Sequence, residues 1–142
     1  MKRILVVAML GAAACGKGSS GYSATYSGNI TETYSCDSSS PPAFVLPDDT
    51  IELDVDGAGN ATIYIGSCPG DTLYGVQNGN EVDIAQTTTF TCTQTDGQGT
   101  NIDITSIGGT LTFDSGGLDV DLTESAGING DSCGGQATGA LN

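Results

Sequence analysis

The sequence predicts an all-β fold, a single antiparallel up-and-down barrel or sandwich of about eight strands that is cross-linked by disulfides. From residue 22 onward, Thr, Ser, Gly, Val and Ile recur with the period-two alternation that is typical of strands. No stretch of ten residues shows the spacing of an amphipathic helix. Turn signals rich in Gly, Asn and Asp divide the alternating stretches, and closure of such a sheet removes or shortens its exposed edges.

The first expected strand, 22–35, carries most of the tyrosines. Tyr22, Tyr26 and Tyr34 share one of its faces, and Gly28 marks a candidate bulge. The connection 37–50 contains three prolines and is therefore expected to interrupt the sheet. The other expected strands are 51–56, 61–66, 72–77, 81–90, 101–113, 118–123 and 135–141.

Turns and a change of parity set the register of these strands. Asn78-Gly79 is the strongest short hairpin signal in the chain. Between Ile104 and Leu111 the apolar residues change parity, so a feature near Ile107-Gly108-Gly109 must reset the register. A bulge would keep one long strand and a Gly-Gly turn would make two short ones; we favour the bulge. The polar stretch 125–133 is expected to be a loop before the last strand.

The first 15 residues have the layout of a secretory signal. Lys2 and Arg3 precede an apolar run, 4–10, that is too short to span a bilayer, and small residues lead from it to Cys15. The tetrapeptide 12–15, Ala-Ala-Ala-Cys, resembles the lipobox of bacterial lipoproteins, in which signal peptidase II cuts before a cysteine that becomes lipidated. That family usually has Leu where Ala12 stands. Ala12-x-Ala14 also suits ordinary signal peptidase I, which leaves plain secretion as the alternative.

The resemblance implies a signal peptide over 1–14, a palmitate-type lipid anchor at Cys15, and a flexible tether over 15–21 that leads to an all-β domain over 22–142. Gly16 stands where lipoproteins retained at the inner membrane often carry Asp. The resemblance therefore implies a place in the cell envelope, at the outer membrane of a Gram-negative host, with contact to the membrane through the lipid only.

The charge of the chain excludes several classes of partner. All 17 acidic residues follow Cys15, and Lys17 is the single base after it, so the mature side-chain charge is −16. Such a surface repels phosphate backbones and anionic lipids, which argues against nucleic acid and against charge-driven membrane binding. The chain has no His, so catalysis by a histidine base is excluded. We expect neither enzymatic activity nor a cofactor.

Four cysteines remain once Cys15 is assigned to the lipid. An even set in an oxidising compartment predicts two disulfides, with three possible connectivities. In a closed sheet the first and last strands are neighbours, which favours Cys36 with Cys133 and leaves Cys68 with Cys92. Zinc is disfavoured, because no pair has Cys-x-x-Cys spacing and no His is present.

One segment is a weak candidate for calcium. Asp54, Asp56 and Asn60, with two glycines between them, resemble the opening of a calcium loop. Ala58 and Ile65 stand where an EF-hand needs oxygen ligands, and a glycine-rich hairpin turn accounts for the same residues. The triplet 114–116, Asp-Ser-Gly, occurs in aspartic proteases, but here it occurs once and matches a turn.

The few aromatic residues allow a ligand cavity or a filled core. They are the weak candidates for lining an apolar pocket, as in calycin-type barrels: Tyr22, Tyr26, Tyr34, Phe44, Phe90 and Phe113. Residues 43–46 are expected to cover the mouth of the barrel or to form an exposed patch.

Three functions remain: a non-catalytic structural or interaction module of the envelope, a lipocalin-like binder of a small apolar molecule, and a calcium-dependent surface module.

Overall fold

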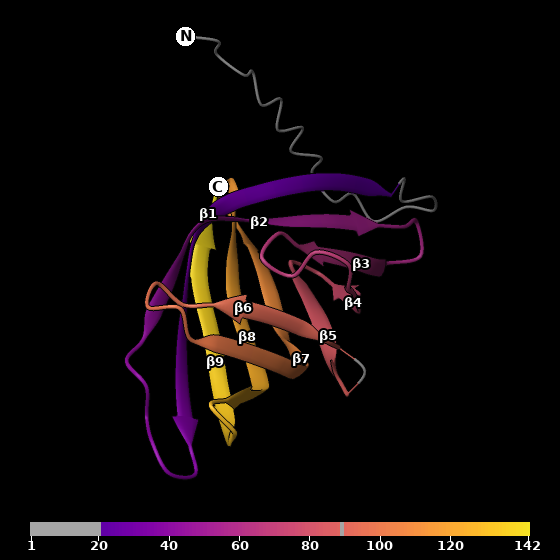
Figure 1. Ribbon diagram of the computed structural model, residues 1–142. Helices are drawn as coiled ribbons and strands as arrows, with labels where there is room; N and C mark the ends of the chain where they lie inside the picture. Colours follow the sequence, from indigo (N-terminus) through magenta and orange to yellow (C-terminus); the bar gives the residue numbers. More distant parts are fainter. Residues whose placement is uncertain (1–20, 89) are drawn as a thin grey trace, which may run out of the picture.

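The computed structural model describes residues 21–88 and 90–142, and these form one sheet of nine antiparallel strands (Figure 1). The expected signal peptide, Cys15 and nearly all of the tether lie outside the described residues. The strands are β1 (Tyr22–Cys36), β2 (Phe44–Val55), β3 (Asn60–Ile65), β4 (Thr72–Asn78), β5 (Glu81–Thr87), β6 (Cys92–Thr95), β7 (Asn101–Asp114), β8 (Gly117–Ile128) and β9 (Asp131–Leu141).

The sheet closes on itself. Its order is β5-β4-β3-β2-β1-β9-β8-β7-β6, and β5 also pairs with β7. β5 and β6 follow one another along the same edge of β7, with Glu81 opposite Thr112 and Thr95 opposite Asn101. They therefore occupy one position in a ring of eight, in which every neighbour follows in chain order and β1 lies beside β9. The prediction of an all-β, antiparallel, up-and-down sheet of about eight strands is confirmed.

The strand expected over 81–90 is interrupted. β5 ends at Thr87, and the chain resumes pairing with β7 at Cys92 as β6, a strand that the sequence did not predict. Phe90 lies between the two strands with its side chain in the core, only 3% exposed. The short run of β6 is polar and carries no aliphatic residue, so its alternation gave no signal.

β2 begins earlier than predicted. The stretch 37–50 was expected to interrupt the sheet, but pairing with β1 starts at Phe44. The register passes from Gly28 opposite Asp49 to Ile30 opposite Leu46, so Pro47 and its neighbour form a bulge on β2. Pro47 is tolerated because this part of β2 has no second partner strand. Figure 1 shows β1 and β2 changing direction sharply along their length.

β7 is one long strand, as the bulge hypothesis predicts. The register irregularity against β8 lies between Ile104 and Ser106, slightly before the predicted Ile107-Gly108-Gly109. The glycines have another role, because a Cβ on Gly108 would lie 2.8 Å from the Cα atom of Gln86 on β5.

The loop expected over 125–133 is instead a tight hairpin. β8 continues to Ile128 and β9 starts at Asp131, with Asn129-Gly130 as the two-residue turn. Both turn residues have positive φ, 52° and 87°, as a type I′ turn requires. Asn-Gly is the same signal that predicted the hairpin at Asn78-Gly79. At Asn129-Gly130 the signal was obscured by the polar residues on both sides of the turn.

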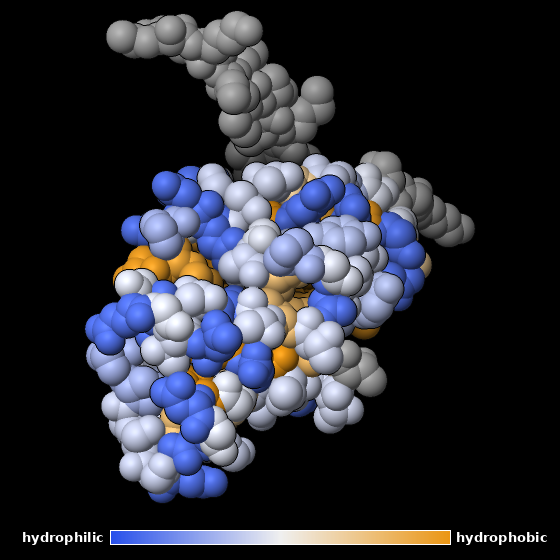
Figure 2. All heavy atoms as spheres, viewed as in Figure 1, coloured by the Kyte–Doolittle hydropathy of each residue, from blue (hydrophilic) through white to orange (hydrophobic). Residues whose placement is uncertain are grey.

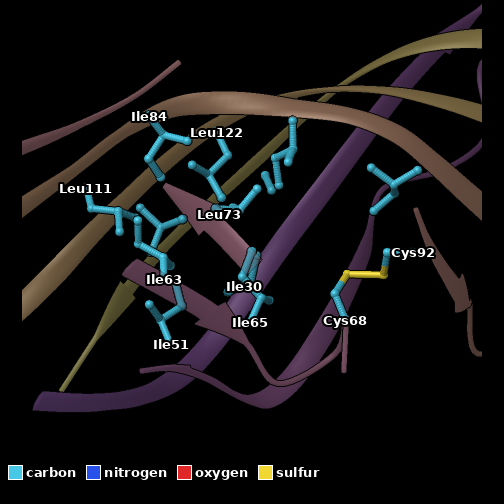
Figure 3. Close-up of a cluster of buried hydrophobic side chains, with 14 of the residues drawn as sticks. Ile30, Ile51, Ile63, Ile65, Cys68, Leu73, Ile84, Cys92, Leu111 and Leu122 are labelled. Carbon is cyan, nitrogen blue, oxygen red and sulfur yellow. A yellow bond between two sulfur atoms is a disulfide. The ribbon is translucent and has the colours of Figure 1, made fainter. Parts of the chain in front are cut away.

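Aliphatic side chains from all the long strands fill the interior. Figure 3 shows Ile63, Leu73 and Leu111 in one part of this cluster and the Cys68–Cys92 disulfide at its other side. The aliphatic residues with 1% or less of their surface exposed are Ile51, Leu53, Ile63, Leu73, Val82, Ile104, Ile107, Leu111, Leu118 and Leu141. Their burial supplies the main stabilisation of the fold.

The predicted pairing of the cysteines is present in the structure. Cys36 of β1 bonds to Cys133 of β9, its direct partner in the register, and Cys68 bonds to Cys92. The first bond closes the sheet between its first and last strands over a sequence separation of 97. In the chain-entropy model a loop of that size stabilises the fold by about 4–5 kcal/mol.

Candidate functional site

A group of polar side chains is buried with the apolar core. Glu32 lies on the inward face of β1 between Ile30 and Tyr34, and Glu124 lies on the inward face of β8. Glu32 is 1% exposed and Glu124 is 6% exposed. Neither glutamate was predicted from the sequence to be buried, although the period-two alternation of each strand places both on the inward face. The other buried polar residues are Asp49, Gln94 and Ser106.

Tyr34 bridges the two buried glutamates. Its phenol oxygen lies 2.8 Å from Glu32 Oε2 and 2.6 Å from Glu124 Oε2. We call these three residues the buried acid pair and its tyrosine. The pKa of Glu124 is raised to about 7, mainly by burial and also by the charge of Glu32, while the hydrogen bond with Tyr34 opposes the shift. Burial also raises the pKa of Glu32, opposed by hydrogen bonds with Tyr34 and Gln94.

A small internal cavity of about 10 Å³ adjoins the buried acid pair. Gln94 lines it, and its Nε2 donates to Ser67 Oγ at 3.1 Å while its Oε1 is buried without a hydrogen-bond partner. Ser67 is held in turn by Asp49, whose carboxylate accepts from the Ser67 backbone N–H at 2.8 Å and from its hydroxyl at 2.7 Å. The cavity has room for about one water molecule.

The six aromatic candidates do not come together around a cavity. Tyr22 and Tyr26 lie beside Phe113, with ring centroids 5.8 and 6.5 Å apart, whereas Tyr34 stacks on Phe44 at 6.2 Å. Phe90 is buried in the core. None of the six lines the internal cavity or the open surface groove of about 340 Å³ that runs along residues 46–50, Gly66 and Ser67.

The calcium candidates are organised as a turn. Asp56 Oδ1 accepts the backbone N–H groups of Ala58 and Asn60, both at 2.8 Å, and its Oδ2 accepts from the Asn60 amide at 2.8 Å. These bonds lower the pKa of Asp56. Asp54 belongs to β2 and pairs with Thr62. Within residues 21–88 and 90–142 no group of three His, Cys, Asp or Glu side chains is arranged to hold a metal ion.

The same turn occurs a second time in the chain. Asp96 Oδ1 accepts the backbone N–H groups of Gln98 and Thr100 at 2.9 and 2.8 Å. Asp56 Oδ1 accepts those of the residues two and four positions after it in the same way. Both segments read Asp-Gly-x-Gly followed by a polar residue, and both join antiparallel neighbours, β2 to β3 and β6 to β7. Because the same hydrogen-bonded turn occurs twice, the role of Asp56 is interpreted as stabilising a hairpin turn rather than binding a cation.

An apolar patch lies on the outer surface of β3 and β4. It consists of Tyr64, Tyr74 and Val76, which are 42%, 70% and 58% exposed, and we call it the tyrosine face. Tyr74 stands opposite Thr62, two residues along β3 from Tyr64, and Val76 follows Tyr74 on the same face of β4, so the three share the outer face of this strand pair. The sequence analysis missed the patch, although parity alone places these side chains outward.

Carboxylates surround the tyrosine face. Glu52 stands opposite Tyr64 and Asp83 stands opposite Val76 in the register, both on the outer surface. Lys2, Arg3 and Lys17 are the only bases in the chain, so the described residues include none. Figure 2 shows that hydrophilic residues dominate the visible side of the molecule, with apolar atoms in separate areas between them.

Comparison of the chain with protein-family models, with curated proteins and with solved structures found no match. None of the described residues forms a helix that is long and apolar enough to cross a membrane.

Proposed function

We propose that this protein is a lipid-anchored, non-catalytic interaction module of the bacterial cell envelope, held at the outer membrane through Cys15, and that the tyrosine face binds a cationic partner. The observation that supports the interaction is an exposed aromatic patch bordered by carboxylates in a domain without a base. The lipobox-like residues before Cys15 support the anchor.

The chemistry of the tyrosine face fits arginine or lysine side chains. Tyrosine rings attract cations through their π faces, and an exposed contact of this kind contributes about 0.5–1 kcal/mol. Glu52 stands opposite Tyr64 and Asp83 stands opposite Val76, and both add a charge of the right sign. With 17 acidic residues in the domain, encounter with a cationic partner is also accelerated by long-range attraction.

The described interior supports an interaction module more than a lipocalin-like binder. Pockets for drug-sized apolar ligands have volumes of roughly 300–1,000 Å³. The internal cavity is about 10 Å³, and polar groups line part of it. Two disulfides fit a protein that functions outside the cytoplasm.

Metabolic labelling with an alkyne analogue of palmitate tests the anchor. We expect label on the wild-type protein, no label on Cys15→Ser, and unchanged labelling of the control Ser19→Ala. Globomycin, which inhibits signal peptidase II, should cause the unprocessed form to accumulate. Absence of label together with normal processing would show that the protein is secreted without a lipid.

Binding of a nona-arginine peptide tests the tyrosine face. We expect the double variant Tyr64→Ser/Tyr74→Ser to weaken binding by about 5- to 30-fold, which corresponds to the loss of two cation–π contacts at exposed sites. The control is Val45→Ser, which removes a side chain 51% exposed on β2 outside this face. If the double variant and the control bind the peptide with equal affinity, the tyrosine rings do not contribute and the binding is due to general charge attraction.

A further inference from the structure

The contacts of Tyr34 require a proton on the buried acid pair. The phenol has one hydrogen, so it can donate to only one of the two carboxylates. Its oxygen is nevertheless within hydrogen-bond distance of both, at 2.8 Å from Glu32 and 2.6 Å from Glu124. Both contacts are hydrogen bonds only if one carboxyl group is protonated and donates to the phenol oxygen.

The surroundings offer no positive charge that would allow both carboxyl groups to ionise. Asp49 from β2 is a further acid, and its charge acts on Glu32. Gln94 from β6 and Ser67 are neutral, and residues 21–142 contain no Lys, Arg or His. The remaining residues around the cavity are Ile30, Ile65, Cys68, Ile107, Leu122 and Ala137. Two buried like charges in such surroundings strongly favour retention of a proton by one of them.

The backbone is shaped to bring Tyr34 to Glu124. In the register Tyr34 stands opposite Gly135 of β9, and Gly135 stands opposite Glu124 of β8. A Cβ on Gly135 would lie 2.5 Å from Tyr34 Cδ1, so the tyrosine ring passes over the glycine to reach the glutamate. The Cys36–Cys133 disulfide fixes this register two residues away.

We propose that the folded domain holds one exchangeable proton in its interior, shared by Glu32, Tyr34 and Glu124, and that loss of this proton as the pH rises through neutrality loosens the closure of the sheet between β1, β9 and β8. With both glutamates ionised, Tyr34 can satisfy only one of them. Two like charges then lie side by side, with no Lys, Arg or His among residues 21–142 to balance them. The domain is therefore a pH-sensitive element that is tightest in acidic surroundings.

The sign of the effect follows from linkage. Glu124 has its pKa raised by folding, from 4.5 to about 7, so the associated stability is fully present below pH 4.5 and is lost as the pH rises to about 7 and above. Between pH 6 and 8.5 the equilibrium constant for unfolding is expected to rise about tenfold. The chain has no His, the side chain whose ordinary pKa would fall inside this window.

Chemical unfolding of the full chain at pH 6 and at pH 8.5 tests the proposal. We expect the tenfold rise in the wild type, no rise in Glu124→Gln, and a wild-type rise in the control Glu52→Gln, which removes an exposed carboxylate of β2. A flat wild-type profile over this window would overturn the proposal. These outcomes do not depend on lipid attachment or on the tyrosine face.

Carbon-13 NMR of the glutamate carboxyl groups gives a second reading of the same proton. We expect one glutamate resonance, that of Glu124, to titrate near pH 7 in the wild-type protein and to be absent from Glu124→Gln. If no glutamate resonance titrates near pH 7, the interior holds no proton at neutral pH and the proposal is wrong.

Discussion

Substitution of Gly135 by Ala is expected to destabilise the domain through the buried acid pair. The added Cβ would lie 2.5 Å from Tyr34 Cδ1 and closer still to Cε1, so the ring must move. Displacement of the ring breaks its contacts with Glu32 and Glu124, and a hydrogen bond to a charged group contributes about 1.5–3 kcal/mol. Part of that loss is recovered if a water molecule replaces the phenol. We therefore expect a loss of about 2–4 kcal/mol in the free energy of unfolding.

The neighbouring residue provides a matched control. Gly134 is exposed on the opposite face of β9, and a Cβ built on it meets nothing within 4 Å. Gly134→Ala should therefore leave stability unchanged or raise it by up to about 1 kcal/mol, because alanine restricts the unfolded chain. Urea unfolding at pH 6 compares the two variants. Equal stability of Gly135→Ala and Gly134→Ala would refute the argument that Gly135 makes room for Tyr34.

A double-mutant cycle separates the clash with the ring from other effects of the alanine. In a Tyr34→Leu background the ring is absent, so Gly135→Ala should cost at least about 1 kcal/mol less than it does in the wild type. The same cost in both backgrounds would place its origin in the backbone of β9 rather than in the tyrosine.

Three further predictions concern the turns and the disulfide. Replacement of Cys36 and Cys133 together by Ser should lower the free energy of unfolding by about 2–5 kcal/mol, measured by urea unfolding without reductant; an unchanged midpoint would contradict the role of this bond in closing the sheet. Asp56→Ala should lower the melting temperature at pH 7 but not at pH 2, because folding lowers the pKa of this carboxyl and the stability it adds is lost as the pH falls through that value. Gly130→Ala should cost about 1–2 kcal/mol, since Gly130 has a φ of 87°, whereas Gly127→Ala, which meets nothing within 4 Å, should be nearly neutral. Similar costs at the two glycines would show that the turn does not need the positive φ.

The sequence predicted the parts of the fold that depend on local alternation and on chain order. Ile51, Leu53 and Val55 alternate with acidic residues and occupy the inward face of β2, as expected. The pairing of Cys36 with Cys133 followed from the closure of an up-and-down sheet, which brings the first and last strands together. The first prediction depends only on the period of the hydrophobic residues and the second only on the order of the strands, so neither requires knowledge of tertiary contacts.

The missed strand segments have a different physical origin. Pro47 suggested a loop, yet it lies in β2 because a bulge removes it from the hydrogen-bonded ladder, and a bulge depends on the partner strand. The hairpin at Asn129-Gly130 was hidden because polar residues on the exposed ends of β8 and β9 resemble a loop in composition.

The candidate sites were the least predictable features. Glu32 and Glu124 have the parity of inward residues, but carboxylates are rarely buried without a partner, and here the partner is a tyrosine 90 residues away from Glu124. The tyrosine face was obscured by the assumption that aromatic residues belong to the core. Asp56 illustrates the opposite error, because a spacing that suits calcium also suits the hydrogen bonds of a turn.

Intact-mass spectrometry of the protein extracted from membranes tests the central proposal most directly. A lipid-anchored module predicts a chain that begins at Cys15, carries the added mass of a diacylglyceryl group and an acyl chain, and keeps both of its disulfides. A soluble chain of unmodified mass, recovered outside the membrane with Cys15 as a free thiol or removed, would contradict it.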